Sequence, residues 1–139
     1  MNIILDAHGG DNAPLEVIKG AAMAVKEYGV QVTLCGRQDD ILSAAEQSGI
    51  PLANLEGIKI APAAQALPMD VDPTEILSSY ANSSMAVGLK LLADGRGDAF
   101  VTAGNTGAVV VGASLVVKRL KGIRRAAIAT VVPTVENPY

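Results

Sequence analysis

The sequence has 139 residues, of which 50% are apolar and 18% charged, so it encodes one folded domain rather than an intrinsically disordered chain. Its formal net charge of −3 and aromatic content of 3% exclude a domain that binds nucleic acid through cationic and stacking side chains. The single cysteine, Cys35, cannot form an intrachain disulfide, and we expect no metal site and a reducing, cytoplasmic location.

Short β-branched runs alternate with segments of helical periodicity in the first third of the chain. This alternation predicts an α/β domain with a parallel sheet. We expect a strand, a helix, a strand and a helix over residues 2–5, 15–28, 30–35 and 40–48. Asp11 or Asn12 is expected to cap the first helix and Gly29 to end it, while Asp39 or Asp40 caps the second.

The middle of the chain contains a short strand over 58–60 and then a proline-interrupted loop over 61–72. A helix start follows, in which Asp72 caps, Pro73 takes the first turn and Glu75 reaches back to the cap. Asn82, Ser83 and Ser84 then introduce a further helix over 85–94, which is ended by glycine.

The last third contains a strand over 99–102, a glycine-rich loop over 103–107 and an apolar segment over 108–120. The valines of the apolar segment also suit a strand, but it is long for a strand, and a parallel sheet needs a crossover before the next one. We therefore expect a buried helix over 108–120 and a strand over 126–132. No apolar run is long enough to cross a bilayer.

Two glycine-rich loops, 6–14 and 103–107, each follow a strand and precede a helix. In a parallel sheet both lie at the carboxyl edge, where ligands of this fold class bind. Helix-start N–H groups can hold a phosphate-like anion there, because glycines let the backbone approach and side chains add donors. The glycines are Gly9, Gly10, Gly104 and Gly107, and the donors are Asn105 and Thr106. The alternative is that the glycines only form tight turns.

Other side chains near these loops have two interpretations each. His8 is an acid or base near neutral pH, or a solvent-facing loop residue. Asp6 and Asp11 ligate magnesium or orient a donor, or act as caps. Ser83 and Ser84 bind the ligand, or cap the helix that follows them.

Two further features have weaker functional interpretations. Cys35 lies inside a strand pattern with no basic neighbour, which argues against a nucleophilic thiolate. A local basic cluster forms a solvated helix end or faces an acidic partner. The cluster comprises Lys118, Arg119, Lys121, Arg124 and Arg125.

Several motifs, in this order and at this spacing, resemble the PlsX-type phosphate acyltransferases of bacterial lipid synthesis. They are Asp6-Ala7-x-Gly9-Gly10-Asp11-Asn12-Ala13-Pro14, Ser83-Ser84-Met85, Ala103-Gly104-Asn105-Thr106-Gly107-Ala108, Lys121-Gly122-Ile123 and Pro133-Thr134. The resemblance covers almost the whole chain. His8 stands where methionine is usual in the family.

The resemblance implies a three-layer α/β/α, Rossmann-like, mostly parallel sheet of the isocitrate/isopropylmalate-dehydrogenase type. It also implies transfer of a fatty acyl group from acyl carrier protein to inorganic phosphate, giving acyl phosphate for phospholipid synthesis. The implied protein is a cytoplasmic homodimer, sometimes beside the membrane, with no cofactor. Family chains are much longer, so this sequence is expected to be an N-terminal fragment forming one domain over 1–139.

On this reading the catalytic residues are Asp6, Asn105 and Thr106. The substrate or phosphate ligands are Gly9, Gly10, Asp11, Asn12, Ser83, Ser84, Gly104 and Gly107. The loop over 103–107 holds phosphate while the loop over 6–12 positions the thioester, with no covalent enzyme intermediate. Two alternatives stay open: a catalytically silent fragment that acts as an anion-binding or dimerisation module, and a nucleotide-dependent dehydrogenase suggested by the fold alone.

Overall fold

The structure is a computed structural model that describes residues 1–51 and 56–130. Four parallel strands form one sheet in the order β3-β2-β1-β4. The strands are β1 (Asn2–Asp6), β2 (Gln31–Gly36), β3 (Ile58–Pro62) and β4 (Ala99–Val101). The parallel α/β sheet predicted from the alternating sequence pattern is therefore confirmed.

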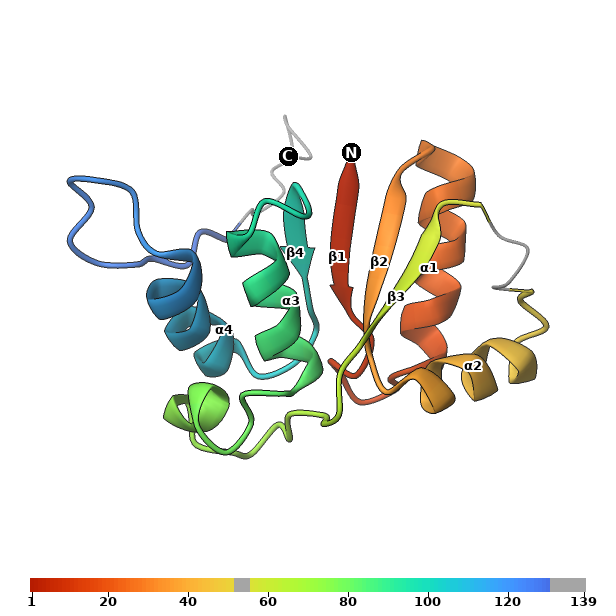
Figure 1. Cartoon of the computed structure of the whole chain (residues 1–139), viewed down its shortest axis with the longest axis horizontal. Coiled ribbons are helices and arrows are strands. Elements are labelled where there is room, and N and C mark those ends of the chain that lie inside the picture. The colour runs from red at the N-terminus through yellow and green to blue at the C-terminus, as the bar shows by residue number, and fades with distance from the viewer. Residues whose placement is uncertain (52–55, 131–139) are drawn as a thin grey trace, which may run out of the picture.

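Helices cover both faces of this sheet (Figure 1). They are α1 (Leu15–Tyr28), α2 (Gln38–Gln47), α3 (Ser84–Ala93) and α4 (Thr106–Gly112). Leu5 packs in the core beneath α1 and α2, whereas its neighbour Ile4 packs in the core beneath α3, because successive side chains of a strand point to opposite faces. The three-layer arrangement is also confirmed.

The direction of winding reverses beside β1. From β1 the chain moves through α1, β2 and α2 to β3 on one side, and α3 then returns it to β4 on the other side. Figure 1 shows the carboxyl ends of the strands and the starts of all four helices along the same edge. The loops after β1 and β4 therefore flank the topological switch point, the usual ligand position of such sheets.

Some predicted caps are present and others are wrong. Ser83 accepts the Ala86 N–H at 3.2 Å and Asp72 accepts the Thr74 N–H at 2.8 Å, as expected, although Asp72 begins only a 3₁₀ turn over Pro73–Leu77. Among the described residues no side chain caps α1 or α2, so the caps predicted at Asp11, Asn12, Asp39 and Asp40 are wrong. The backbone carbonyls of Asn12 and Arg37 accept N–H groups of those first turns instead.

The helix predicted over 108–120 is shorter and less buried than expected. It begins at Thr106, widens into a π-helical turn over Ala113–Val117 and ends at Lys118, whose φ is 71°. Only Ala108 and Gly112 are buried, and 61% of Leu115 is exposed, because α3 and the 3₁₀ turn cover just one face. Within residues 1–51 and 56–130, no helix is long and apolar enough to cross a membrane.

The strand predicted over 126–132 is wrong for its described part. Residues 126–130 are exposed and irregular, and residues 131 and 132 lie outside the described residues, as does the Pro133-Thr134 motif. β-branched residues form a strand only when a neighbouring strand pairs with them. Residues 126–130 make no such pairing in the described part of the chain, where β4 is an edge strand of the sheet.

One face of β4 is uncovered. Val101 lies beside Leu5 in the sheet register, but α1 sits over the other strands, and 47% of Val101 is exposed. An apolar hollow of about 360 Å³ results, with Val17, Ala24 and Val101 among its lining residues. The hollow follows from topology rather than composition, because no described helix crosses this face of β4.

Replacing glycine by alanine should have opposite effects on stability at two helical positions, Gly20 and Gly88. A Cβ on Gly20 would meet no atom within 4 Å, so Gly20→Ala gains helix propensity and should stabilise the fold by about 0.5–1 kcal/mol. A Cβ on buried Gly88 would overlap Phe100 and lie 3.3 Å from Ile4 Cγ2, so Gly88→Ala should cost about 1–3 kcal/mol. Urea unfolding measures both, and equal effects would contradict this packing of α3 on β1 and β4.

Cys35 faces the α3 layer of the core and is fully buried. Burial, with a smaller contribution from the nearby Asp6 carboxylate, raises the pKa of its thiol to about 12. The thiol is therefore protonated at neutral pH, which agrees with the sequence-based argument against a nucleophile.

This burial predicts an unreactive thiol. At pH 8 the native chain should not react with a chromogenic disulfide reagent, since the pH lies well below the raised pKa and the sulfur is covered. In denaturant the same reagent should release one thiol equivalent per chain. Rapid labelling of the native protein would contradict the packing of Cys35 of β2 against α3.

Candidate active site

The two glycine-rich loops meet through the Asp6 carboxyl group. Asp6 ends β1 and is 2% exposed. Its Oδ1 accepts the His8 backbone N–H at 3.1 Å, and its Oδ2 accepts the Thr102 hydroxyl at 2.8 Å. Thr102 Oγ1 in turn accepts the Gly104 N–H at 3.0 Å. A continuous chain of hydrogen bonds therefore joins the loop after β1 to the loop after β4.

Glycine allows these loops to approach so closely. A Cβ on Gly9 would lie 2.5 Å from Thr102 Oγ1 and 2.9 Å from the Gly104 nitrogen. Gly10 has a φ of +105° and faces Ala103, a conformation that other residues rarely adopt. Gly9 therefore allows close contact between the two loops, and Gly10 allows the tight turn.

Asn105 has a mainly internal role. Its Oδ1 accepts the Ala108 N–H at 3.0 Å, which caps α4. Its Nδ2 donates to the carbonyls of Met69 and Val71 at 3.0 and 3.1 Å, which ties the proline-interrupted loop to the site. The Asn105 side chain, predicted from the sequence as a donor to phosphate, therefore forms its hydrogen bonds within the protein.

Thr106 is more open than Asn105. It is exposed at the first position of α4, beside a hollow of about 350 Å³ that also borders Gly104 and Phe100. The next residue, Gly107, packs against Pro73, whose Cγ would lie 2.7 Å from an added Cβ. The first turn of α4 thus offers a hydroxyl group next to an open space.

The start of α3 reaches the same place. Ser83 caps the helix and is buried, so its capping role is confirmed. Ser84 is also buried, and its Oγ finds no hydrogen-bond partner among the described residues. A Cβ on Gly104 would lie 3.1 Å from Met85 Cε, so the Met85 side chain of α3 reaches the second glycine loop.

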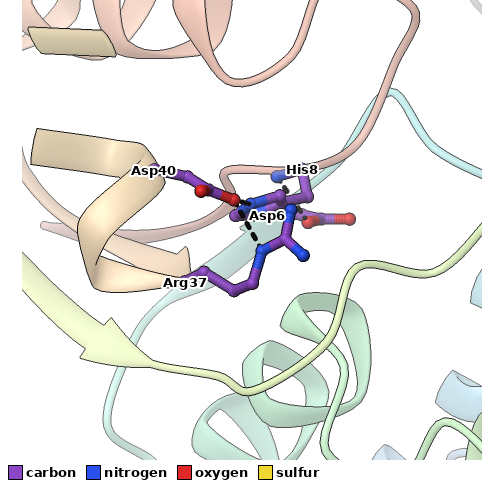
Figure 2. A network of polar contacts seen from close by, with 4 residues as sticks. All are labelled: Asp6, His8, Arg37 and Asp40. Carbon is purple, nitrogen blue, oxygen red and sulfur yellow. Dashed lines mark hydrogen bonds and ion pairs between the residues drawn. The ribbon is translucent and has the colours of Figure 1, made fainter. Parts of the chain in front are cut away.

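His8 is neither solvent-facing nor free. Only 6% of its side chain is exposed, so the expectation of a solvent-facing loop histidine is wrong. Its Nε2 lies 3.0 Å from Asp40 Oδ2, and Arg37 Nε donates to the same oxygen at 2.5 Å (Figure 2). The hydrogen bonds from His8 and then from Arg37 lower the pKa of Asp40.

Asp11 and Asn12 lie apart from this network. Both are exposed, and within the described residues neither side chain forms a hydrogen bond. Across residues 1–51 and 56–130 no three His, Cys, Asp or Glu side chains gather closely enough to hold a metal ion. The basic cluster over 118–125 is exposed after the end of the α4 segment and takes no part in the Asp6 network.

Three residues of the network were missed from the sequence: Thr102, Asp40 and Arg37. A signal existed for Thr102, since it directly follows β4, and the carboxyl ends of β4 and β1 share an edge of the sheet. Arg37 and Asp40 are a helical i, i+3 pair directly after β2. The contact of Asp40 with His8 links positions 32 residues apart, which no local pattern indicates.

The chain is similar to a known protein family over nearly its whole length. The family described as Fatty acid synthesis protein matches residues 1–138. A phosphate acyltransferase of Desulfitobacterium hafniense is 37% identical over 137 residues, covering 99% of this chain and 40% of the relative. Phosphate acyltransferases of Thermotoga maritima and Dictyoglomus thermophilum are 39% and 40% identical, over 99% and 96% of this chain.

These relatives are longer proteins. The chain spans 38% of the Thermotoga maritima relative and 39% of the Dictyoglomus thermophilum relative. The family match nevertheless includes both glycine-rich loops, the start of α3 and the Asp6 network. By this match, the chain belongs to the Fatty acid synthesis protein family.

Proposed function

We propose that this chain is the amino-terminal part of a phosphate acyltransferase. The reaction transfers a fatty acyl group from the thioester of acyl carrier protein to inorganic phosphate, and the acyl phosphate enters phospholipid synthesis. The observation that carries the proposal is the contact between two glycine-rich loops at the switch point, beside an open hollow at the first turn of α4. The printed name of the relatives, phosphate acyltransferase, agrees with it.

The chemistry requires orientation more than a protein nucleophile. A phosphate oxygen attacks the thioester carbonyl carbon, the carbonyl oxygen gains negative charge, and the carbon–sulfur bond breaks to release the carrier thiolate. Because phosphate is itself the nucleophile, the protein holds the two substrates together and stabilises the developing oxyanion. Cys35 takes no part, since its thiol is buried and protonated.

We assign phosphate to the loop over 103–107. The Thr106 hydroxyl and the N–H groups of Thr106 and Gly107 are its donors, while Asn105 holds the turn in place by its three hydrogen bonds. Ser84 adds a hydroxyl group that is unpartnered among the described residues, with Ser83 capping the helix beneath it.

We assign the thioester to the loop over 9–12. Gly9 and Gly10 bring the backbone close to Gly104 and Ala103, and Asp11 and Asn12 of the same loop are exposed. Asp6 is kept from the substrates by its bonds to His8 and Thr102, so its role in this proposal is to hold the loops at the distance that the attack needs.

The proposed partners follow from the same reaction. Acyl carrier protein delivers the acyl group, and the whole protein is a cytoplasmic homodimer that also associates with the membrane periphery. Exposed apolar side chains after α4 favour association with another surface. They are Leu115, Val117, Leu120, Ile123 and Ile128.

Thr106 provides the sharpest test of the phosphate assignment. Thr106→Val keeps the shape of the side chain but removes the hydroxyl, so phosphate binding should weaken by about tenfold to a hundredfold, the loss of one hydrogen bond to a charged ligand. Thr106→Ser restores the hydroxyl and should bind phosphate as the original chain does. Titration with inorganic phosphate, followed by amide chemical shifts of residues 104–108, measures the affinity of all three. Equal affinities for the original chain and Thr106→Val would remove this hydroxyl from the site.

An activity assay distinguishes an enzymatic role of this chain from a role as a catalytically silent anion-binding or dimerisation module. Incubation of the chain with acyl carrier protein thioester and phosphate should release carrier thiol and form acyl phosphate, which hydroxylamine traps as a hydroxamate. Both products should require phosphate and should fall in Thr106→Val. Phosphate binding without any hydroxamate would favour the silent module for these 139 residues.

A further inference from the structure

His8 forms the side-chain tie between the first glycine loop and a neighbouring helix. Among the described side chains of residues 7–14, that of His8 alone forms a hydrogen bond to another element: its Nε2 lies 3.0 Å from Asp40 Oδ2. The backbone bonds of the loop are local or lead back to β2, as from Ala7 N–H to the Cys35 carbonyl at 2.9 Å. The position of the loop outside β1 therefore depends strongly on the imidazole ring.

The ring is held from two sides. A Cβ on Gly36 would lie 2.5 Å from His8 Nδ1 and 2.7 Å from Cε1, so glycine at the end of β2 makes room for this edge of the ring. Nδ1 is buried and has no partner among the described residues. A neutral imidazole there carries its proton on Nε2, which donates to the Asp40 carboxylate.

The Asp40 carboxylate is the acceptor for that proton. It lies in the first turn of α2, where the helix dipole favours a negative charge, and Arg37 holds the same carboxylate oxygen at 2.5 Å. Figure 2 shows the four polar side chains in one cluster, with Arg37 and Asp40 from the start of α2 on one side of His8. The network thus couples the end of β2 and the start of α2 to the loop after β1.

A small displacement of His8 affects the site directly. The next residue, Gly9, is in backbone contact with the second loop, where an added Cβ would lie 2.5 Å from Thr102 Oγ1. The His8 N–H also donates to Asp6, whose other oxygen binds Thr102. Movement of the ring therefore changes both links between the two loops, and displacements of this size strongly affect sites that align two substrates.

We propose that Asp40, acting through His8, is a positioning residue that holds the Gly9–Gly10 turn against the Thr102–Gly104 turn. The proposal extends the proposed function, because it states what aligns the thioester loop with the phosphate loop. The proposal assigns neither side chain a contact with substrate, because His8 is buried against Gly36 and Asp40 is bonded to His8 and Arg37.

The test compares Asp40→Ala with Asp39→Asn in the whole 139-residue chain. Asp39→Asn removes a carboxylate from the same turn of α2, but Asp39 is exposed and within the described residues forms no side-chain bond. Asp40→Ala should accelerate hydrogen exchange of the His8 and Gly104 amides by about tenfold, the loss of one charge-assisted bond. Exchange of the Leu34 amide in β2 should stay within about twofold, and Asp39→Asn should leave all three amides as they are.

Two further variants separate positioning from general destabilisation. Asp40→Asn keeps an acceptor for His8 Nε2–H and should restore most of the slow exchange. His8→Met removes the ring, so adding Asp40→Ala to it should cause no further change at Gly104, because coupled residues are not additive. The ¹⁵N shifts of His8 should report a proton on Nε2 in the original chain and a mixture of tautomers in Asp40→Ala.

Phosphate affinity connects this result to function. Titration with inorganic phosphate should give an affinity reduced about threefold to tenfold in Asp40→Ala and unchanged in Asp39→Asn, as expected when one bond of the support is lost. If the original chain binds no phosphate, the proposed function fails, but the exchange and tautomer measurements still decide the positioning role. Unchanged exchange at His8 and Gly104 in Asp40→Ala, or equal effects of the two carboxylate variants, would overturn the proposal.

Discussion

The hydrogen bond from Thr102 to Asp6 is the interaction on which the rest of the site depends. A carboxyl group that is 2% exposed needs hydrogen-bond partners, because burial without them is costly. Its partners come from the loops that follow β1 and β4, so Asp6 is satisfied only while the loops touch. Gly9 permits this contact, since a Cβ there would lie only 2.5 Å from Thr102 Oγ1.

A carboxylate so near a proposed anion site has two opposing effects. Its charge repels phosphate, and repulsion between charges grows as water is excluded. However, Oδ1 accepts the His8 N–H and Oδ2 accepts the Thr102 hydroxyl, so both oxygens are turned toward protein donors. The first turn of α4, with Thr106 exposed, remains the place where an anion meets donors. Asp6 is thus better suited to holding the loops than to contacting phosphate.

Local sequence patterns predicted most helices and strands correctly. They gave wrong predictions where contacts between residues far apart in the chain determine the structure. The end of α1 at Gly29, which adopts the αL conformation, and the Ser83 cap were predicted correctly, because each depends on a few neighbouring residues. Asp40 was predicted as a helix cap, but its carboxylate binds Arg37 and His8 instead. Ile128 and Thr130 are β-branched and favour a strand, yet the described residues form none over 126–130, because a strand needs a partner.

By itself the sequence determined the parallel α/β class and the placement of both glycine loops at one edge, because hydrophobic periodicity and turn residues act over a few positions. Only the tertiary structure decided that β4 lies beside β1, that Asp6 joins its loop to that of Thr102, and that His8 is buried against Gly36 and bonded to Asp40. These contacts join residues far apart in the chain, and their geometry follows from the strand order and the packing of whole elements.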